Sequence, residues 1–559
     1  MFAWLFGIGA ILSLYSMYQQ KGRKMLLAMK LCADICWVWH YFFLGAIAGM
    51  IPNFVGIFRE LVFINRKKYK FANIPLWPIL FILSNITLSV LSFEVWFDVL
   101  PIVASAFVTI SLWIDNPNLT KGISVPVAIA FLIYNALVCS YIGVINETIT
   151  IFSIFVFFNK VRREKMKKKL LFNEDFKTEK NLIIREGAPI ENIRRTITSS
   201  VSKQVIERGE AFANEITQRF VSDFEKVGDK MAHVSTFKVV DDYVYMTYYA
   251  NTKEPSEDPK NQTIRFVYAP IDNIEQKTFI DLQTTGDMVG DKTIDMVYDC
   301  IFMQKDVDTF YIMWTASAEG GNYYRFYRPF NTSTKTLGEV GVNKFKVGNI
   351  VNDLSISGIK SALAENGIPC KNMTVDIGIM QKESYRIENG VKYCYSGLYN
   401  TYFNCIIKSS DLITWEYVSQ PDFINDSLYE NATYVLGDKV YYFVRQIDAN
   451  KCGFLTVYNL KTKKWEQPIE IEDCQSRSDF IMYKDNLYLF HAPIDREHIG
   501  VIKINTDDIA KSEVVLQAKM PTSCFYPFIQ YYKDGELAMS YTVSRKHIRL
   551  AQFDLKKYL

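Results

Sequence analysis

The pattern of hydrophobic and polar positions divides this chain of 559 residues into three parts. Residues 1–160 are dominated by Leu, Ile, Val, Phe and Trp, and their charges are confined to short clusters. Residues 161–232 are rich in Lys, Arg and Glu, and over residues 233–559 apolar and polar positions alternate as they do in short strands. These three styles of sequence predict three structural parts, in a chain long enough for about two to four domains.

The first part predicts a bundle of seven transmembrane helices. A helix needs about 20 mostly apolar residues to span a bilayer, and no polar face recurs along these segments that would suit a single water-soluble helical core. The helices are expected at residues 2–18, 25–44, 47–64, 74–92, 95–114, 122–139 and 142–159.

The third and seventh of these helices repeat one another. Residues 49–68 and 143–162 align without a gap, and both begin with Gly and end in Asn followed by a basic run. The segment 1–160 therefore reads as two three-helix units joined by a single fourth helix. Because an odd number of helices separates the units, this 3+1+3 arrangement is a parallel repeat.

Basic residues predict how the bundle lies in the membrane. Lys and Arg gather in the first, third and fifth loops, for example at Arg23, Arg66 and Lys121, and again after the seventh helix. The intervening loops hold only acidic charges. The positive-inside rule then places the amino terminus outside and the strand-rich part of the chain in the cytoplasm.

A set of residues in and after the first three helices carries a resemblance to a known family. These are Tyr18-Gln19-Gln20-Lys21, His40-Tyr41-Phe42, Gly45, Asn53, Arg59 and Asn65-Arg66-Lys67-Lys68. Residues 1 to about 165 resemble the YgjV-type family of bacterial inner-membrane proteins, and the 3+1+3 arrangement is similar to that of sugar transporters of the SWEET and PQ-loop type. The resemblance implies an inner-membrane location, and transport only by analogy of fold.

Polar side chains inside a bilayer are candidates for function. Asn53 follows Pro52, where a kink would free backbone carbonyls into an interior cavity. Asn135, Trp37 and Trp39 are expected at a comparable depth, so the four side chains are candidates to bind a small polar solute. The alternative is that Asn53 only satisfies the kinked backbone.

The second part predicts a helical stalk. Residues 160–185 form a basic run suited to anionic lipid head groups. After Pro189, apolar residues recur at four-residue steps, which predicts an amphipathic helix of about 35 residues. We expect this helix to pack back on its own domain. The alternative is that it self-associates as a coiled stalk, which would make the protein a homo-oligomer.

The third part repeats one motif, an alternating strand, a turn built on Asp, Asn or Gly, and a second strand rich in Tyr, Phe and Val. The copies lie at residues 237–252, 299–318, 384–399, 431–446, 479–493 and 527–542. Six copies favour an all-β six-bladed propeller, and a β-sandwich is the alternative.

Two segments of this part, residues 409–418 and 526–554, resemble blades of sialidase-like and other glycoside-hydrolase propellers. Such sialidases hold a carboxylate with three arginines and use a Tyr paired with a Glu as nucleophile. The resemblance places Glu430, Arg445 and Tyr526 in the catalytic set of such an enzyme. Arg477 and Arg545 are further candidates to bind an anionic group.

The chain departs from that pattern in the first blade. Where these families carry an arginine, the only basic residue is His233, and no second catalytic acid is evident there. The leading interpretation is therefore a non-catalytic propeller that binds a ligand or partner, joined to a bundle that anchors it or moves a small solute. A membrane-tethered glycoside hydrolase is the alternative.

The composition of the chain mainly excludes classes of function. The formal net charge is +3, and no motif or basic patch indicates nucleic acid. The five His residues have no ligand spacing and no phosphate-binding glycine loop is present, so we expect neither a metal nor a cofactor. The expected partners are the lipid bilayer and a carbohydrate or small polar solute.

Overall fold

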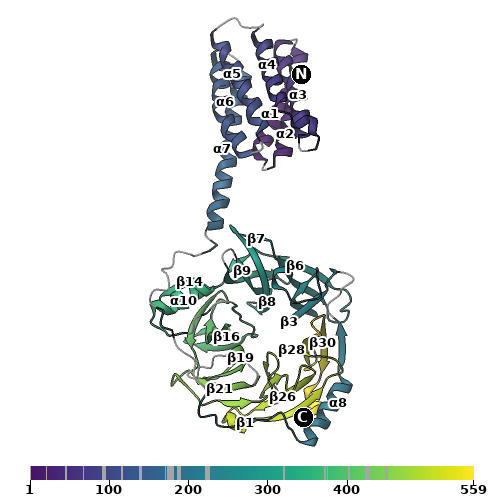
Figure 1. Ribbon diagram of the computed structural model, residues 1–559, viewed down its shortest axis with the longest axis vertical. Coiled ribbons are helices and arrows are strands. Elements are labelled where there is room, and N and C mark those ends of the chain that lie inside the picture. Colours follow the sequence, from purple (N-terminus) through teal and green to yellow (C-terminus); the bar gives the residue numbers. More distant parts are fainter. Residues whose placement is uncertain are drawn as a thin grey trace. The chain divides into compact units, whose positions relative to one another are not determined.

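The computed structural model describes the chain in two compact units, residues 1–167 and 168–559, which are treated separately here (Figure 1). The residues outside the description are 1, 21, 45–46, 67, 91–95, 115–116, 138–140, 170, 173–181, 185–189, 221–226, 319–320, 371–372, 374–375, 401–402, 422–427 and 447–450, together with some further side chains.

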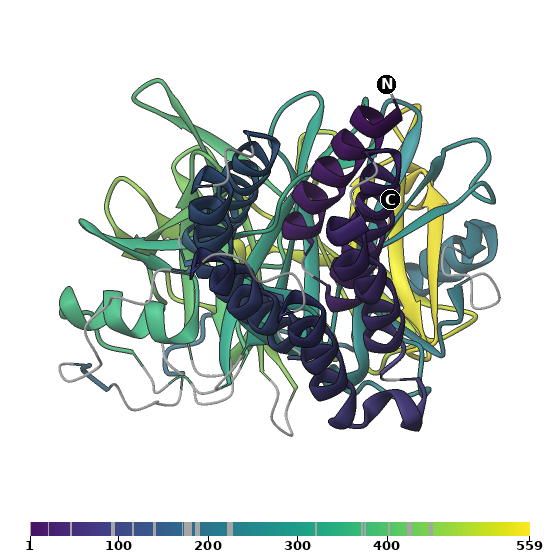
Figure 2. The ribbon, with the colours of Figure 1, turned by 90° about the horizontal axis from the view of Figure 1, so that it is seen from above.

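Every apolar segment of the first unit forms a helix. The bounds are α1 (Phe2–Gln19), α2 (Arg23–Leu44), α3 (Ile47–Ile64), α4 (Leu76–Val90), α5 (Val99–Trp113), α6 (Pro117–Leu137) and α7 (Tyr141–Lys169). The helices run alongside one another (Figures 1 and 2) and share a core that includes Met17, Leu27, Phe63, Leu112 and Ile154. Within the residues described, no helix meets the length and hydropathy that crossing a membrane requires.

Basic residues from three loops meet at one end of this unit. The Arg23 guanidinium donates to the carbonyl of Leu112 at 2.9 Å, and that of Arg66 donates to the carbonyl of Trp113 at 2.5 Å. Lys121 donates to the carbonyl of Gln20, just past the end of α1. Cations at the carboxyl end of a helix satisfy its last carbonyls and favour its dipole.

The second unit is a six-bladed β-propeller, as the six strand pairs predicted (Figure 1). Each predicted pair forms the first two long strands of one sheet. The first three sheets are β3–β6 (Met231–Val240, Tyr243–Asn251, Gln262–Pro270, Thr278–Thr284), β7–β12 (Met288–Val289, Lys292–Gln304, Thr309–Ala318, Asn322–Asn331, Thr336–Leu337, Gly341–Val342) and β13–β18 (Lys344–Val347, Ile350–Asp353, Ser384–Glu388, Val391–Asn400, Phe403–Ser409, Thr414–Ser419).

The remaining three sheets complete the ring. They are β19–β23 (Leu428–Leu436, Lys439–Gln446, Gly453–Asn459, Lys464–Trp465, Ile469–Ile471), β24–β27 (Asp479–Tyr483, Asn486–His491, His498–Ile504, Glu513–Lys519) and β28–β30 (Phe525–Tyr531, Leu537–Val543, His547–Phe553). Helix α10 (Ile356–Glu365) lies between β14 and β15 in the sequence.

The expected turn chemistry is visible in the backbone. Asp241 and Asp242 between β3 and β4 have φ of 48° and 60°, and Lys484 and Asp485 between β24 and β25 have φ of 45° and 64°. Two consecutive positive φ values are the signature of the type I′ turn, whose twist matches that of antiparallel strands. Asp and Asn tolerate this conformation better than most residues, which is why they punctuate the repeats.

The prediction of a single long amphipathic helix after Pro189 is wrong. The segment instead forms β1 (Thr196–Ile197), helix α8 (Lys203–Glu215) and β2 (Thr217–Phe220). Strand β1 adds in parallel to β23, and β2 adds antiparallel to β30 as the outermost strand of the last blade. Helix α8 lies beside the C-terminal strands, drawn in yellow (Figures 1 and 2), and buries Phe212 against Phe553 and Tyr558.

The first strands of the blades, including β3, β8, β19, β24 and β28, contact one another around the middle of the ring. Because they all run in the same direction through the blades, their starting residues share one end of the ring and their last residues share the other. On β3, β8 and β28, four or five residues of strand separate His233, Asp299 and Tyr526 at one end from Lys238, Gln304 and Gln530 at the other, which is about 15 Å. We refer to these as the entry end and the exit end.

Candidate functional site

Irregularities in the first strands mark the entry end. The ladder shifts register between His233 and Thr236 in β3, between Tyr298 and Cys300 in β8, and between Phe525 and Phe528 in β28. A β-bulge turns a side chain away from the direction that regular alternation gives it, and bulges are frequent beside functional sites.

The backbone at these bulges adopts an uncommon conformation. Val234, Asp299 and Tyr526 have φ of 52°, 47° and 55°, in the left-handed region that non-glycine residues seldom occupy. A fourth bulge, between Leu428 and Asn431 in β19, contains Glu430. Backbone strain of this kind persists where the surrounding structure enforces it, and it clusters at functional sites.

Glu430 and Arg445, both expected in the site, form a buried ion pair. Oε2 of Glu430 lies 2.9 Å from Nε of Arg445, and the side chains are 4% and 9% exposed. The Gln475 carbonyl accepts a hydrogen bond from Nη1 of Arg445 at 3.0 Å and another from Nε of Arg496 at 3.0 Å. The shared carbonyl therefore brings two guanidinium groups from neighbouring blades together.

Tyr526 lies among cationic and aromatic side chains. Its ring centre is 4.9 Å from that of His233 and 5.5 Å from Cζ of Arg477, and Ser476 Oγ accepts a hydrogen bond from its backbone N–H at 2.8 Å. Burial, followed by the charge of Glu430, raises the pKa of Tyr526 above its ordinary value. The phenol is therefore protonated at neutral pH, and it would need a base to act as a nucleophile.

Arg477 is the least satisfied polar side chain of the site. It is only 1% exposed, and none of its three guanidinium nitrogens has a hydrogen-bond partner among the described residues. Native structures leave very few buried polar groups unpaired, and a buried charge without a partner is costly. Among the described residues, Arg477 is therefore a buried cation without a hydrogen-bonded anion.

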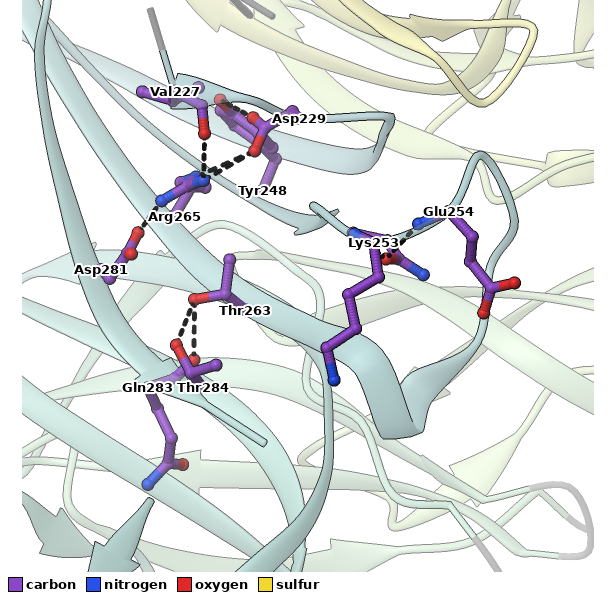
Figure 3. Close-up of polar contacts among 11 residues, drawn as sticks. Val227, Asp229, Tyr248, Lys253, Glu254, Thr263, Arg265, Asp281, Gln283 and Thr284 are labelled. Carbon is purple, nitrogen blue, oxygen red and sulfur yellow. Dashed lines mark hydrogen bonds and ion pairs between the residues drawn. The ribbon is translucent and has the colours of Figure 1, made fainter. Parts of the chain in front are cut away.

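A buried arginine in blade one, Arg265, contrasts with Arg477 because all three of its guanidinium nitrogens have hydrogen-bond partners (Figure 3). The Arg265 guanidinium donates to Oδ1 of Asp229 from Nη2 at 2.7 Å and from Nε at 3.2 Å, to the Val227 carbonyl at 3.1 Å, and to Asp281. The Tyr248 hydroxyl donates to the other oxygen of Asp229 at 3.2 Å. This cluster fixes the segment before β3, and it gives each guanidinium nitrogen of Arg265 a partner within the protein.

His233 stands where an arginine was expected in the first blade, and it is neutral. Burial, together with the charges of Arg545, Arg496 and Arg477, holds the pKa of His233 well below its ordinary value. Nδ1 of His233 lies 3.1 Å from Oγ1 of Thr542. The histidine can therefore offer a hydrogen bond to a ligand, but it offers no positive charge.

Asp299 is a carboxylic acid that the sequence did not reveal. Burial and the nearby charge of Glu430 raise the pKa of Asp299 from 3.8 to about 6, against the opposing effect of a hydrogen bond from Tyr399. Arg325, which lies beside it, donates to backbone carbonyls, including that of Ile379 at 2.7 Å. Asp299, in β8, and Arg496, in the turn between β25 and β26, were both missed because their sequence surroundings give no local sign that they lie at this end of the ring.

Arg545 is engaged elsewhere in the cluster. It forms an ion pair with Glu257, whose other oxygen accepts a hydrogen bond from the Tyr249 hydroxyl at 2.5 Å. The Arg545 side chain is 43% exposed, so this pair lies at the rim of the entry end. Of the arginines considered from the sequence, Arg477 and Arg445 are the ones buried at its centre.

Two candidate residues of the helical unit, Trp37 and Trp39, lie on different faces of α2. Trp37 contacts His40 edge-on, whereas Trp39 is 45% exposed and stacks on Phe6. Positions two apart on a helix point to different faces, so the two Trp side chains diverge. Asn53 is half-buried in α3, and the side chain of Asn135 lies outside the described residues.

The helical unit instead buries a charged network. Arg59 contacts Glu60 at 2.9 Å and Asp34 at 3.8 Å, and Lys30 also pairs with Asp34. Asp34, Arg59 and Glu60 are at most 5% exposed. Gly56 makes room for this network, because a Cβ there would lie 2.6 Å from Oδ2 of Asp34.

Comparison with known proteins gives one family. Residues 1–165 match the family Imp-YgjV, described as "Bacterial inner membrane protein". The resemblance expected for this part is thereby confirmed, and it supports an inner-membrane location. No curated protein matches the chain.

Among solved structures, two of those similar to this chain are sialidases. "NanB plus Optactamide" is 8% identical, with a TM-score of 0.40 over 61% of this chain and 70% of that one. The NanB sialidase from Streptococcus pneumoniae in complex with 2-[(3-chlorobenzyl)ammonio]ethanesulfonate is 10% identical, with a TM-score of 0.38 over 58% of this chain and 68% of that one. The propeller fold of this chain is established by its own six sheets.

Proposed function

We propose that this chain is an inner-membrane protein whose propeller binds an anionic ligand, a carbohydrate that bears a carboxylate, at the entry end of the ring. The observation that carries the proposal is Arg477, a buried guanidinium with no hydrogen-bond partner among the described residues. A carboxylate would satisfy it with the two parallel hydrogen bonds that guanidinium groups favour.

The surroundings of Arg477 suit such a ligand. Arg445 and Arg496 are held at the same end by the Gln475 carbonyl, and Glu430 neutralises only one of them. The Tyr526 ring and the neutral imidazole of His233 offer apolar faces together with hydrogen-bonding groups. Sites that combine a few convergent polar groups with aromatic surface are typical of small-molecule binding.

Binding of N-acetylneuraminic acid and of its uncharged methyl ester to the full chain in detergent tests the proposal. We expect the acid to bind about tenfold more tightly than the ester or better, and Arg477→Gln to remove that preference. Lys546→Gln, which removes an exposed positive charge from the β29–β30 turn, is the matched control and should bind as the native chain does. Equal affinity for acid and ester would refute the carboxylate clamp.

For the helical unit we propose seven membrane-spanning helices in a 3+1+3 parallel repeat, with the amino terminus outside and the propeller in the cytoplasm. Support comes from the family match over residues 1–165 and from the gathering of Arg23, Arg66 and Lys121 at one end of the unit. Single surface cysteines in the propeller should resist an impermeant maleimide on intact cells, and their labelling would overturn this topology. The unit serves as an anchor or moves a small polar solute.

Glycoside hydrolysis is the second candidate, and Asp299 is the observation that favours it. A carboxylic acid with a pKa of about 6 can donate a proton to a leaving group at near-neutral pH. Tyr526 and Glu430 would supply the nucleophile and its base, although His233, the first-blade residue at this end, is neutral. Turnover of a fluorogenic sialoside by the full chain, abolished in Tyr526→Phe, would establish this activity, and no turnover with any glycoside would leave binding as the function.

A further inference from the structure

A polar cavity opens at the exit end of the ring, toward the ends of the first strands. Its volume is about 320 Å³, and its lining includes Lys238 near the end of β3, Gln304 at the end of β8 and Gln530 near the end of β28. On the same three strands, His233, Asp299 and Tyr526 lie four or five residues earlier. The cavity is therefore separate from the entry-end site, by about 15 Å along the strands.

The cavity carries an excess of positive charge. Four lysines line it, Lys238, Lys305, Lys382 and Lys392, against the carboxylates of Glu383 and Asp306. Blades one, two and three contribute these lysines, so the charge converges from several elements on one space. A sequence reading could not find this cluster, because the four residues span more than one hundred positions of the chain.

Two of these lysines are already paired. Lys238 forms an ion pair with Glu383, and Lys382 contacts Oδ2 of Asp479 at 2.6 Å and the carbonyl of Ile529 at 2.5 Å. Burial, reinforced by the neighbouring lysines, lowers the pKa of Lys238 to about 8. A further negative charge nearby would therefore stabilise the protonated, positively charged form of Lys238.

The other two lysines, Lys305 and Lys392, lie at the rim of the cavity. The ammonium group of Lys305 lies 5.1 Å from the centre of the Tyr311 ring, and that of Lys392 lies 3.9 Å from the centre of the Tyr385 ring. Neither has an ion pair with a carboxylate among the described residues. Both side chains belong to exposed residues, so they can reach a solute in the mouth of the cavity.

The cavity wall also offers uncharged hydrogen-bonding groups. The amides of Gln304 and Gln530 line it and supply donors and acceptors for hydroxyl groups. The carboxylate oxygens of Glu383 are buried, and this carboxylate forms an ion pair with Lys238, so the hydroxyls of a solute do not reach it.

From this arrangement we infer that the exit-end cavity binds a small polyhydroxylated anion, whose phosphate or carboxylate group meets Lys305 and Lys392 while its hydroxyls form hydrogen bonds with the amides of Gln304 and Gln530. The cavity volume lies at the lower end of the range for small-molecule sites, which suits a single phosphorylated or oxidised sugar unit. Lysine ammonium groups bind such anions as compact charges.

Isothermal titration of the full chain in detergent, in phosphate-free buffer, tests this inference with four probes. Glucose 6-phosphate and gluconate carry both features, glucose lacks the charge, and inorganic phosphate lacks the hydroxyls. We expect at least one of the first two to bind about tenfold more tightly than glucose and phosphate, and the preferred one identifies the charged group. Binding of phosphate as tight as that of glucose 6-phosphate and gluconate, or no binding of either, would overturn the inference.

Variants locate the binding. The double variant Lys305→Gln/Lys392→Gln changes two exposed side chains and should weaken the sugar anion about tenfold or more, whereas Lys463→Gln, on an exposed turn of blade four, should have no effect. The double variant should keep the native preference of the entry-end site for N-acetylneuraminic acid over its methyl ester, which separates the two sites. Native affinity in the double variant would contradict the inference.

Discussion

A Cβ atom at Gly209 would lie 1.8 Å from the carbonyl oxygen of Gln517, so helix α8 touches strand β27 backbone to backbone. This contact places Phe212 in the core formed by the last two blades. It shows how a segment that precedes the propeller is held firmly against its final strands.

Replacing this glycine should loosen α8. Gly209→Ala forces the helix away from β27, because neither backbone can yield locally, and we expect a loss of about 2 kcal/mol or more in the free energy of unfolding of the propeller. Denaturant unfolding followed by Tyr and Trp fluorescence measures it. Gly122→Ala is the control, since a Cβ there meets nothing within 4 Å, and equal behaviour of the two variants would argue against this docking.

The two buried arginines should respond to substitution with opposite signs. Arg477→Met removes an unpaired buried charge and should stabilise the ligand-free propeller by about 1–3 kcal/mol. Arg265→Met strands the buried carboxylate of Asp229 and should destabilise it by about 3–5 kcal/mol. Thermal unfolding without ligand compares them, and destabilisation by both would mean that Arg477 has partners.

Asp299 should make stability depend on pH. Its native pKa of about 6 lies above the ordinary 3.8, so between these values the native state holds a proton that the unfolded state has lost. Its contribution to stability is therefore full below pH 4 and falls as the pH rises to 6. Asp299→Asn, which keeps a residue that tolerates positive φ, should abolish this loss, so its stability relative to the native chain should grow by roughly 3 kcal/mol from pH 4 to pH 7.

Measuring both proteins across this range isolates Asp299 from other titrating groups. A constant difference between them would show that the carboxyl is already ionised at low pH, and it would weaken the case for Asp299 as a proton donor.

In the helical unit, Arg59 should act as the hub of the buried charges. Arg59→Met leaves Glu60, which is fully buried, without its cation and should cost about 3–5 kcal/mol. Adding Glu60→Leu should recover part of that loss, because the pair is then removed together. Thermal unfolding in detergent of both single variants and the double variant gives the coupling, and additive losses would contradict a direct pair.

The hairpins of the propeller could be predicted because their information is local. Alternation marks the strands, and Asp241–Asp242 or Lys484–Asp485 mark the tight turns between them. The segment from residue 190 to 224 misled for the opposite reason. Its apolar residues recur at four-residue steps, yet Ile197 is buried by blade four while Phe212 is buried by blades five and six, and tertiary contacts outweigh the periodicity.

The entry-end site was predictable only in part. Glu430, Arg445 and Tyr526 could be placed from their motifs, and all three lie at this end. The positions of Asp299 and Arg496 at this end depend on the bulge in β8 and on the closure of the ring, which no local sequence pattern reveals. That Arg477 has no hydrogen-bond partner among the described residues is a property of the packed state alone, since the sequence offers many acids that could have paired with it.

The pairing of β2 with β30 has a consequence for how the protein is made. Residues 217–220 leave the ribosome long before residues 547–553, their partners in the last blade. During synthesis β2 must wait, unpaired, while five blades form, and the ring can close only after residues 547–553 have been made. Premature truncation anywhere before residue 553 would therefore leave an exposed strand edge at each side of the gap, a surface prone to aggregation.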